Sequence, residues 1–148
     1  MTSLRLAERG DLPAIVALLA EDPLGSGREH LHDLAPYAAA YDAIAADPAQ
    51  VLLVAVDDGD VVGTLQLTVI PGLSRGGALR AQVEAVRVRA DHRGEGLGEV
   101  MLRWSVEEAG RRGCALVQLT TDKSRPDAHR FYERLGFRAT HEGFKLTL

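Results

Sequence analysis

The chain has 148 residues, a length that suits one compact domain spanning residues 1–148. Hydrophobic residues make up 46% of it, enough to form a core, and the single cysteine excludes an internal disulfide. The 17 basic and 21 acidic residues give a net charge of −4, so no overall basic field attracts nucleic acid. No apolar run approaches the roughly 18 residues of a membrane helix. We expect a cytoplasmic protein without nucleic-acid or membrane partners.

The first half of the chain carries signals for two helices and a β-hairpin. Asp11 occupies the position of a helix N-cap, with Pro13 in the first turn and an apolar stripe behind it. Asp58 and Gly59 form a typical hairpin turn between two apolar runs. In chain order we expect a strand at 4–6, a helix after Asp11, a helix at 34–46, and strands at 51–56 and 61–70.

The second half of the chain alternates strands with helices. Gly113 follows two arginines, which is typical of a helix C-terminus. In chain order we expect a loop at 71–77, a strand at 82–88, a helix at 96–112, a strand at 116–121, a short helix at 127–135, and a closing pair of strands at 137–140 and 144–148. This order predicts an α/β (α+β) fold with a mixed sheet and helices on both faces.

A glycine-rich turn joins the strand at 82–88 to the longest predicted helix. Its sequence is Arg-Gly-Glu-Gly-Leu-Gly at residues 93–98, the segment called the glycine loop below. Glycines allow unusual dihedral angles and a close approach of a ligand to the backbone. The first turn of a helix also presents unpaired N–H groups and the positive end of the helix dipole. The segment therefore predicts a phosphate or pyrophosphate site, with an ordinary flexible turn as the alternative.

Two other glycine-rich phosphate motifs are excluded. A P-loop requires Gly-Lys followed by Ser or Thr, which occurs nowhere in the chain. The dinucleotide fingerprint requires glycines at positions one, three and six. Counted from Gly94 the sixth position is Glu99, and counted from Gly96 it is Met101.

Two motifs together make the chain resemble the GNAT family of N-acetyltransferases. The glycine loop matches the acyl-CoA signature of that family, Gln/Arg-x-x-Gly-x-Gly/Ala. Residues 128–137 match its second hallmark, a helix carrying a tyrosine followed by Leu-Gly-Phe. The resemblance is weak before Val51 and strong after Gln82, and the two motifs in the right order are more specific than either alone.

The resemblance implies a mixed, mostly antiparallel sheet that is splayed between its fourth and fifth strands, with pantetheine in the gap. Acetyl-CoA would be the co-substrate, and Val86 and Val88 would pair with the pantetheine arm through their backbones. The backbone amides that would hold the pyrophosphate are those of Arg93, Gly94, Glu95, Gly96, Leu97 and Gly98. Arg125 stands where many members carry a cofactor-contacting asparagine, so whether Arg125, Ser124 or Asp127 makes that contact stays open.

Acetyl transfer to an amine requires a proton acceptor, because a free alkylamine near neutral pH is almost wholly protonated. Glu84 is the candidate base, since similar proteins often carry a glutamate at this place on the fourth strand. In a regular strand Glu84 would share a face with Val86 and Val88, although a bulge would shift that register. The alternative is a solvated strand residue or the ion-pair partner of an arginine.

Release of the coenzyme A thiolate gains from a nearby proton donor, and Tyr132 matches the family position for that role. The alternative is a core tyrosine that packs with Phe131 and Phe137. No arrangement of nucleophiles requires an acyl-enzyme, so we expect an amine to attack directly in a ternary complex. The second hypothesis is a binding module that senses or sequesters acyl-CoA. The presence of both Glu84 and Tyr132 favours the enzyme over this module.

Several other residues carry weaker signals. His30 and His32 lack neighbours at metal-ligand spacing, so no metal site is expected. Cys114 is expected to be a buried structural cysteine. Arg87 and Arg89 are expected on the strand face opposite Val86 and Val88, either near coenzyme A phosphates or simply exposed. Tyr37 and Tyr41 could line an acceptor pocket, but their spacing favours core contacts. A homodimer is compatible with the sequence, which fixes no interface.

Overall fold

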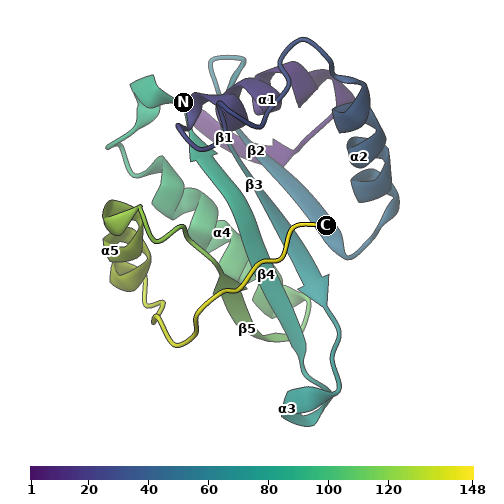
Figure 1. Cartoon of the computed structure of the whole chain (residues 1–148), viewed down its shortest axis with the longest axis vertical. Helices are drawn as coiled ribbons and strands as arrows, with labels where there is room; N and C mark the ends of the chain where they lie inside the picture. The colour runs from purple at the N-terminus through teal and green to yellow at the C-terminus, as the bar shows by residue number, and fades with distance from the viewer. The chain divides into compact units, whose positions relative to one another are not determined.

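The computed structural model describes residues 1–148 and divides into two units, Met1–Gln118 and Leu119–Leu148 (Figure 1). No helix in either is both long enough and apolar enough to cross a membrane.

A five-stranded sheet organises the first unit. Its strands follow one another in space as they do in sequence, so each hydrogen-bonds to the next. The first four are antiparallel neighbours, whereas the fourth and fifth run parallel. The strands are β1 Thr2–Leu6, β2 Gln50–Asp57, β3 Asp60–Ile70, β4 Leu79–Val88 and β5 Cys114–Leu119, whose last residue belongs to the second unit. The turn at Asp58 and Gly59 has positive φ angles of 52° and 88°, as the hairpin prediction requires.

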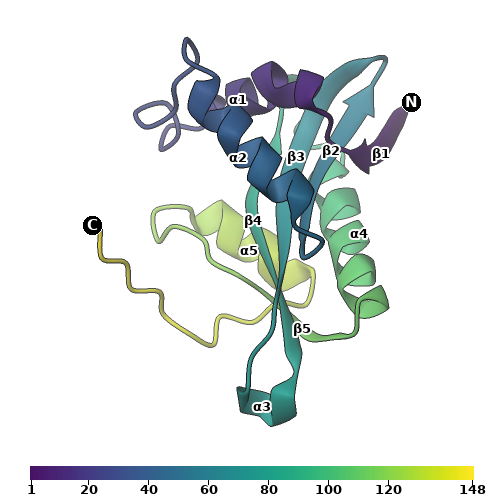
Figure 2. The ribbon, with the colours of Figure 1, turned by 90° about the vertical axis from the view of Figure 1, so that its right-hand side faces the viewer.

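Helices cover both faces of this sheet, with α1 and α2 on one face and α4 on the other (Figure 2). The helical segments of the first unit are η1 Arg9–Asp11, α1 Leu12–Glu21, α2 Ala35–Ala46, α3 Ser74–Gly77, η2 Ala90–His92 and α4 Leu97–Arg111. The core lies between α4, α1 and the central strands, where Leu53, Leu65 and Met101 are almost wholly buried. Helix α4 approaches β3 so closely that a Cβ at Gly63 would lie 3.1 Å from Met101 Sδ.

A β-bulge interrupts β4 at Ala85, whose φ of 54° is unusual for a residue with a side chain. Glu84 pairs with Gln66 and Arg87 pairs with Thr64, so one residue of β3 faces two of β4. Cross-strand partners share a face of the sheet. The bulge therefore places Glu84 and Arg87 together on the α1 side, and Val88, which pairs with Gly63, on the α4 side.

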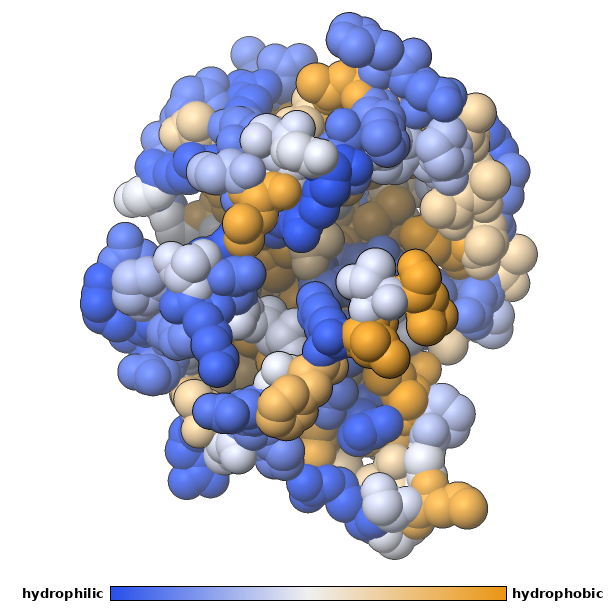
Figure 3. Space-filling model, viewed as in Figure 1, coloured by the Kyte–Doolittle hydropathy of each residue, from blue (hydrophilic) through white to orange (hydrophobic).

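The second unit contains one helix and an extended tail. Helix α5 spans Pro126–Arg134, and residues 137–148 follow it as an open segment (Figure 2). The tail exposes Phe144 (93%) and Leu146 (87%). Elsewhere the face seen in Figure 3 is mostly hydrophilic, with apolar side chains in small separate patches.

Most of the predicted elements are confirmed within one to three residues at each end. The expected loop at 71–77 contains only the short turn α3, in which Arg75 and Gly76 have left-handed backbone angles in place of helical ones. One prediction is wrong, because the closing pair of strands at 137–140 and 144–148 does not form. Apolar alternation at 144, 146 and 148 is present, but a two-stranded ribbon is marginal unless a further strand or helix covers one face. The side chains of the tail are exposed from residue 138 onward, so pairing would be supported by no burial.

Candidate functional site

The glycine loop has the backbone that the sequence predicts for an anion site. Gly94 and Gly96 have φ angles of 80° and 82°, in the left-handed region that disfavours other residues. Gly96 is the N-cap of α4, and no side chain caps the helix there. Nothing lies within 4 Å of where a Cβ would stand at either glycine. The backbone angle rather than lack of space therefore requires glycine, and the surface of the loop is open to a ligand.

Amide groups at the start of α4 supply the donors. The first hydrogen bond of the helix runs from the Val100 N–H to the Gly96 carbonyl at 3.1 Å. The N–H groups of Leu97, Gly98 and Glu99 precede it and have no partner within the helix. The Glu99 carboxylate is paired with Arg103 at 2.7 Å, which offsets its charge near this end. Together with the helix dipole, these amides fit the pyrophosphate of a coenzyme A.

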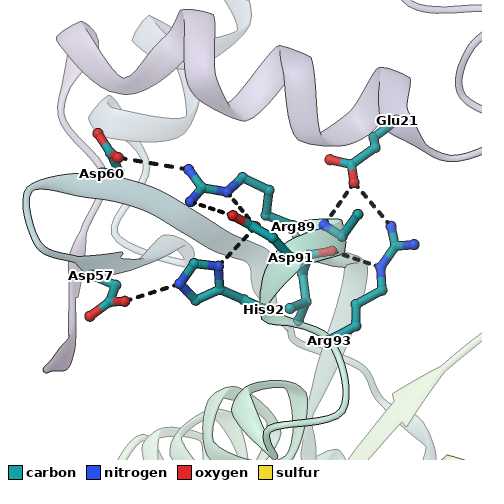
Figure 4. A network of polar contacts seen from close by, with 9 residues as sticks. Glu21, Asp57, Asp60, Arg89, Asp91, His92 and Arg93 are labelled. Carbon is teal, nitrogen blue, oxygen red and sulfur yellow. Dashed lines mark hydrogen bonds and ion pairs between the residues drawn. The ribbon is translucent and has the colours of Figure 1, made fainter.

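The side chain of Arg93 folds back toward the protein instead of extending from the loop. Its Nε donates to the Val88 carbonyl at 3.0 Å, and its guanidinium lies 3.5 Å from Glu21 Oε1 at the end of α1. The same Glu21 oxygen accepts the Ala90 N–H at 2.8 Å (Figure 4). Glu21 thus ties the segment before the glycine loop to α1, a contact between residues about 70 positions apart that no local pattern predicts.

A histidine between two carboxylates lies in the same segment. His92 Nδ1 is 2.9 Å from Asp91 Oδ1, and its Nε2 is 3.0 Å from Asp57 Oδ2 at the end of β2 (Figure 4). Asp91 and then Asp57 raise the pKa of His92. Hydrogen bonds from Arg89 and then from His92 lower the pKa of Asp91. No sequence motif singles out His92, although it stands directly before the acyl-CoA signature.

The backbone of β4 beside the loop is partly occupied. The Val86 carbonyl accepts a hydrogen bond from the Arg87 guanidinium at 2.9 Å, and the Val88 carbonyl accepts the one from Arg93. A carbonyl oxygen has two lone pairs, so each can accept a second donor. The expected pairing with pantetheine would therefore share these carbonyls with arginines.

Glu84 is exposed, and its side chain forms no hydrogen bond or ion pair in the structure. The interpretation of Glu84 as the ion-pair partner of an arginine is therefore wrong. Two interpretations of its carboxylate remain: a catalytic base and a solvated surface group. The expectation for a regular strand, in which Glu84 shares a face with Val86 and Val88, does not apply because the bulge at Ala85 moves it to the α1 side.

Arg87 corrects a second expectation. It does lie on the face opposite Val88, but its side chain is only 14% exposed and its guanidinium is 3.0 Å from Asp22 Oδ2, which is 8% exposed. Asp22 directly follows α1 and also accepts the Leu24 N–H at 3.1 Å. This buried ion pair fixes the end of α1 to β4 on the face that carries Glu84.

A cavity of about 360 Å³ lies at the connection between α1 and α2. Its lining residues are Ala20, Ser26, Glu29, His30, Leu31, His32 and Asp33. Tyr37 orders this wall, since its hydroxyl donates to Glu29 Oε1 at 2.9 Å and accepts the His30 N–H at 2.8 Å. Helix α2 buries no residue, so the core role expected for Tyr37 is wrong. Partial burial, together with the neighbouring Glu29 carboxylate, raises the pKa of the Tyr37 hydroxyl.

Tyr132 lies on α5 in the second unit, between two aromatic neighbours. Its ring meets that of Phe131 edge to face at 5.2 Å and that of Phe137 at 6.0 Å. The Phe137 N–H returns to the Tyr132 carbonyl at 3.1 Å, closing the helix end. These contacts hold the ring as the packing interpretation requires. Proton donation by the hydroxyl to the coenzyme A thiolate stays a prediction.

Arg125 is the N-cap residue of α5, and its side chain makes no capping bond. Ser124, one alternative for the cofactor contact, donates its hydroxyl to Asp122 at 2.6 Å. Asp127, the other alternative, is paired with Arg130. Both alternatives are thus engaged by neighbours on the same segment. Cys114 is half-buried, so the expectation of a buried cysteine is only partly met, and this burial raises the pKa of its thiol.

Comparison with known proteins identifies the same family through most of the chain. The model of the Acetyltransferase (GNAT) family matches residues 12–137. An aminoalkylphosphonate N-acetyltransferase of Salmonella typhimurium is 32% identical over 148 residues, covering 98% of this chain and 90% of that protein. A glucosamine 6-phosphate N-acetyltransferase of Trypanosoma brucei brucei is 37% identical over 91 residues, covering 61% of this chain and 59% of that protein.

A solved structure agrees over the full length. A protein from Bacillus halodurans C-125, described as a transcriptional regulator, is 44% identical and superposes with a TM-score of 0.97, with all of both chains covered. The chain therefore shares its fold over its full length, and nearly half of its sequence, with that protein.

Proposed function

Because this chain belongs to the Acetyltransferase (GNAT) family and is an acyl-CoA-dependent N-acetyltransferase with acetyl-CoA as its co-substrate, we propose that its acceptor is the primary amine of a small molecule that also carries a phosphonate or phosphate group. The observation that carries the acceptor class is the match along 98% of the chain to an aminoalkylphosphonate N-acetyltransferase. The second relative acts on an amino sugar phosphate, so both named acceptors combine an amine with a phosphorus-containing anion.

The glycine loop is the proposed pyrophosphate site. Its positive φ angles, its open surface and the amides before the first hydrogen bond of α4 support this assignment. Residues 93–98 would bind through their backbone, because the Arg93 side chain is turned away toward Val88 and Glu21. The backbones of Val86 and Val88 would hold the pantetheine arm, and Arg125 is proposed to contact the cofactor in place of the asparagine that many family members carry.

Glu84 is the proposed base. It is exposed, unpaired, and lies on the α1 side of the sheet, the side that also carries the cavity between α1 and α2. The carboxylate would take a proton from the ammonium group, directly or through one water, so that the neutral amine attacks the thioester carbonyl. Attack forms the new C–N bond, and collapse of the tetrahedral intermediate breaks the C–S bond.

Tyr132 is the proposed acid. Its hydroxyl would give a proton to the departing thiolate. The nitrogen loses a proton as the amide forms, and that proton would return to the Tyr132 oxygen through solvent. The products are the N-acetylated amine and coenzyme A as the free thiol. The ring contacts with Phe131 and Phe137 would hold the hydroxyl in one orientation.

A screen of acceptors tests the acceptor class. Thiol release from acetyl-CoA should be fastest with aminoalkylphosphonates or glucosamine 6-phosphate, and mass spectrometry should show the acetylated amine. Each amine is paired with its analogue that lacks the phosphorus group, such as the plain alkylamine or glucosamine, and peptide amines form a third arm. Equal kcat/KM for both members of each pair, or a peptide acetylated faster than either, would refute the proposed class.

A further inference from the structure

The segment directly before the glycine loop is held in place by charged side chains from two distant elements. Residues 89–93 are tied to α1 through Glu21 and to the β2–β3 hairpin through His92 and Asp57 (Figure 4). Arg89 adds a bidentate pair with Asp91, at 2.7 and 3.0 Å, and lies 3.9 Å from Asp60 on the hairpin. The contact of His92 with Asp57, at 3.0 Å, is the shorter of the two side-chain links between this segment and the hairpin.

The geometry fixes the protonation state that this link requires. Each ring nitrogen of His92 faces a carboxylate oxygen, at 2.9 Å on one side and 3.0 Å on the other. A carboxylate can only accept, so both nitrogens must donate, and only the imidazolium carries two N–H groups. A neutral ring would keep one of the two hydrogen bonds and lose the other.

We infer that His92 is a positioning residue for the cofactor: as an imidazolium it joins Asp91 to Asp57 and thereby holds the glycine loop in the conformation that receives the pyrophosphate of acetyl-CoA. This inference rests on the proposed placement of the pyrophosphate at residues 93–98. His92 itself would touch no substrate. A loop that is already ordered loses less conformational freedom when the ligand binds, so the link should appear as affinity for acetyl-CoA.

The charged groups around His92 decide the direction of the pH dependence. Asp91 and Arg89 lie on its own segment, Asp57 faces it from β2, and the amino group of Met1 lies 3.1 Å from Asp57 Oδ1. The carboxylates prevail, since the pKa of His92 is raised. The link is therefore complete below the ordinary pKa of histidine, about 6.5, and is lost as pH rises through the higher pKa of the folded protein.

Calorimetric titration with acetyl-CoA tests the inference. The affinity of the unaltered protein should fall about 5- to 10-fold between about pH 6 and about pH 9. His92→Gln should already bind acetyl-CoA about 5- to 10-fold more weakly at the lower pH, and its affinity should change only slightly between the two pH values. That slight change comes from groups present in both proteins, among them the cofactor's own phosphate and the Met1 amino group. Glu108→Gln, which removes a carboxylate paired with Arg111 and Arg112, is the matched control and should follow the unaltered protein.

Two further measurements separate positioning from other roles. Asp57→Ala, which leaves no acceptor for His92, should reproduce the loss at low pH and keeps the test usable if His92→Gln folds poorly. A titration at about 0.5 M salt separates positioning from direct attraction between the imidazolium and phosphate, which salt would screen. If His92 positions the loop, the difference in affinity between the unaltered protein and His92→Gln should stay the same. Parallel pH profiles, tight binding by both variants at low pH, or a difference that salt abolishes would overturn the inference. Failure of the pyrophosphate placement itself would show separately, as normal binding by a folded Gly96→Glu protein.

Discussion

The segment before and through the glycine loop and the connection between α1 and α2 are built in opposite ways. Backbone amides make the proposed cofactor site, and side chains from α1, β2 and β3 hold the segment before it in place. Exposed polar side chains line the cavity that we propose as the acceptor side, where the Tyr37 hydroxyl joins Glu29 to the His30 backbone. A site made of backbone depends on a few glycines and suits a ligand common to the family. A site made of side chains can change with each residue, which suits the variable acceptor.

Gly96→Glu should produce the largest effect, because it attacks the backbone site directly. The substitution adds bulk and a negative charge where phosphate would sit and strains a φ of 82°. Acetyl-CoA should no longer raise the melting temperature of the folded variant, since a ligand stabilises only the state that binds it.

Gly110→Glu is the matched control for this change. Gly110 lies near the other end of α4, also with open space around it but without a positive φ. The same side chain there should leave the melting shift caused by acetyl-CoA intact. Equal shifts in both variants would mean that the pyrophosphate binds elsewhere and would erase the contrast between the two regions.

Glu84→Gln should have the next largest effect, on chemistry rather than on binding. Glutamine keeps the shape but accepts no proton, so the chemical step should slow by roughly 10²–10⁴-fold. Rapid-mixing measurements of a single turnover report that step, and calorimetry should show unchanged affinity for acetyl-CoA. Glu107→Gln on the exposed face of α4 serves as the control. A normal single-turnover rate for Glu84→Gln would make Glu84 only a solvated carboxylate.

Tyr132→Phe should have a smaller effect, because a thiolate is a fairly good leaving group. Loss of the hydroxyl should lower kcat and kcat/KM together, by about 10-fold or less, with affinity for acetyl-CoA preserved. The best acceptor amine must be used so that attack does not limit the rate. Tyr41→Phe, which removes a weak hydrogen bond to the Ala7 carbonyl at 3.4 Å, is the control. Normal turnover with a lowered melting temperature would make Tyr132 a packing residue.

The contrast also explains what the sequence could and could not predict. The glycine loop, the helix after it and the Asp58–Gly59 hairpin depend on local backbone chemistry, and all were predictable from a few adjacent residues. The bulge at Ala85 was not, because nothing local marks an alanine for a positive φ. The pair between Asp22 and Arg87 and the link between Asp57 and His92 each join residues far apart in sequence, so only the folded chain reveals them. The closing hairpin failed because alternation alone supplies no partner to cover it.

Tyr37→Phe should give the smallest effect and probes the acceptor side alone. The hydroxyl joins Glu29 to the His30 backbone, so its loss should loosen the cavity wall. Tyr37 is half-exposed, and the free energy of unfolding should fall by only about 0.5–1 kcal/mol, the low end for a lost hydrogen bond.

The kinetic signature of this variant separates the two regions. A looser cavity should raise KM for the acceptor a few-fold while KM for acetyl-CoA stays constant, because the glycine loop does not depend on Tyr37. Initial rates measured over a grid of both substrate concentrations give the two constants from one preparation. An increase in KM for acetyl-CoA of the same size would mean that the two regions respond as one, and that the acceptor cannot be changed independently of the cofactor.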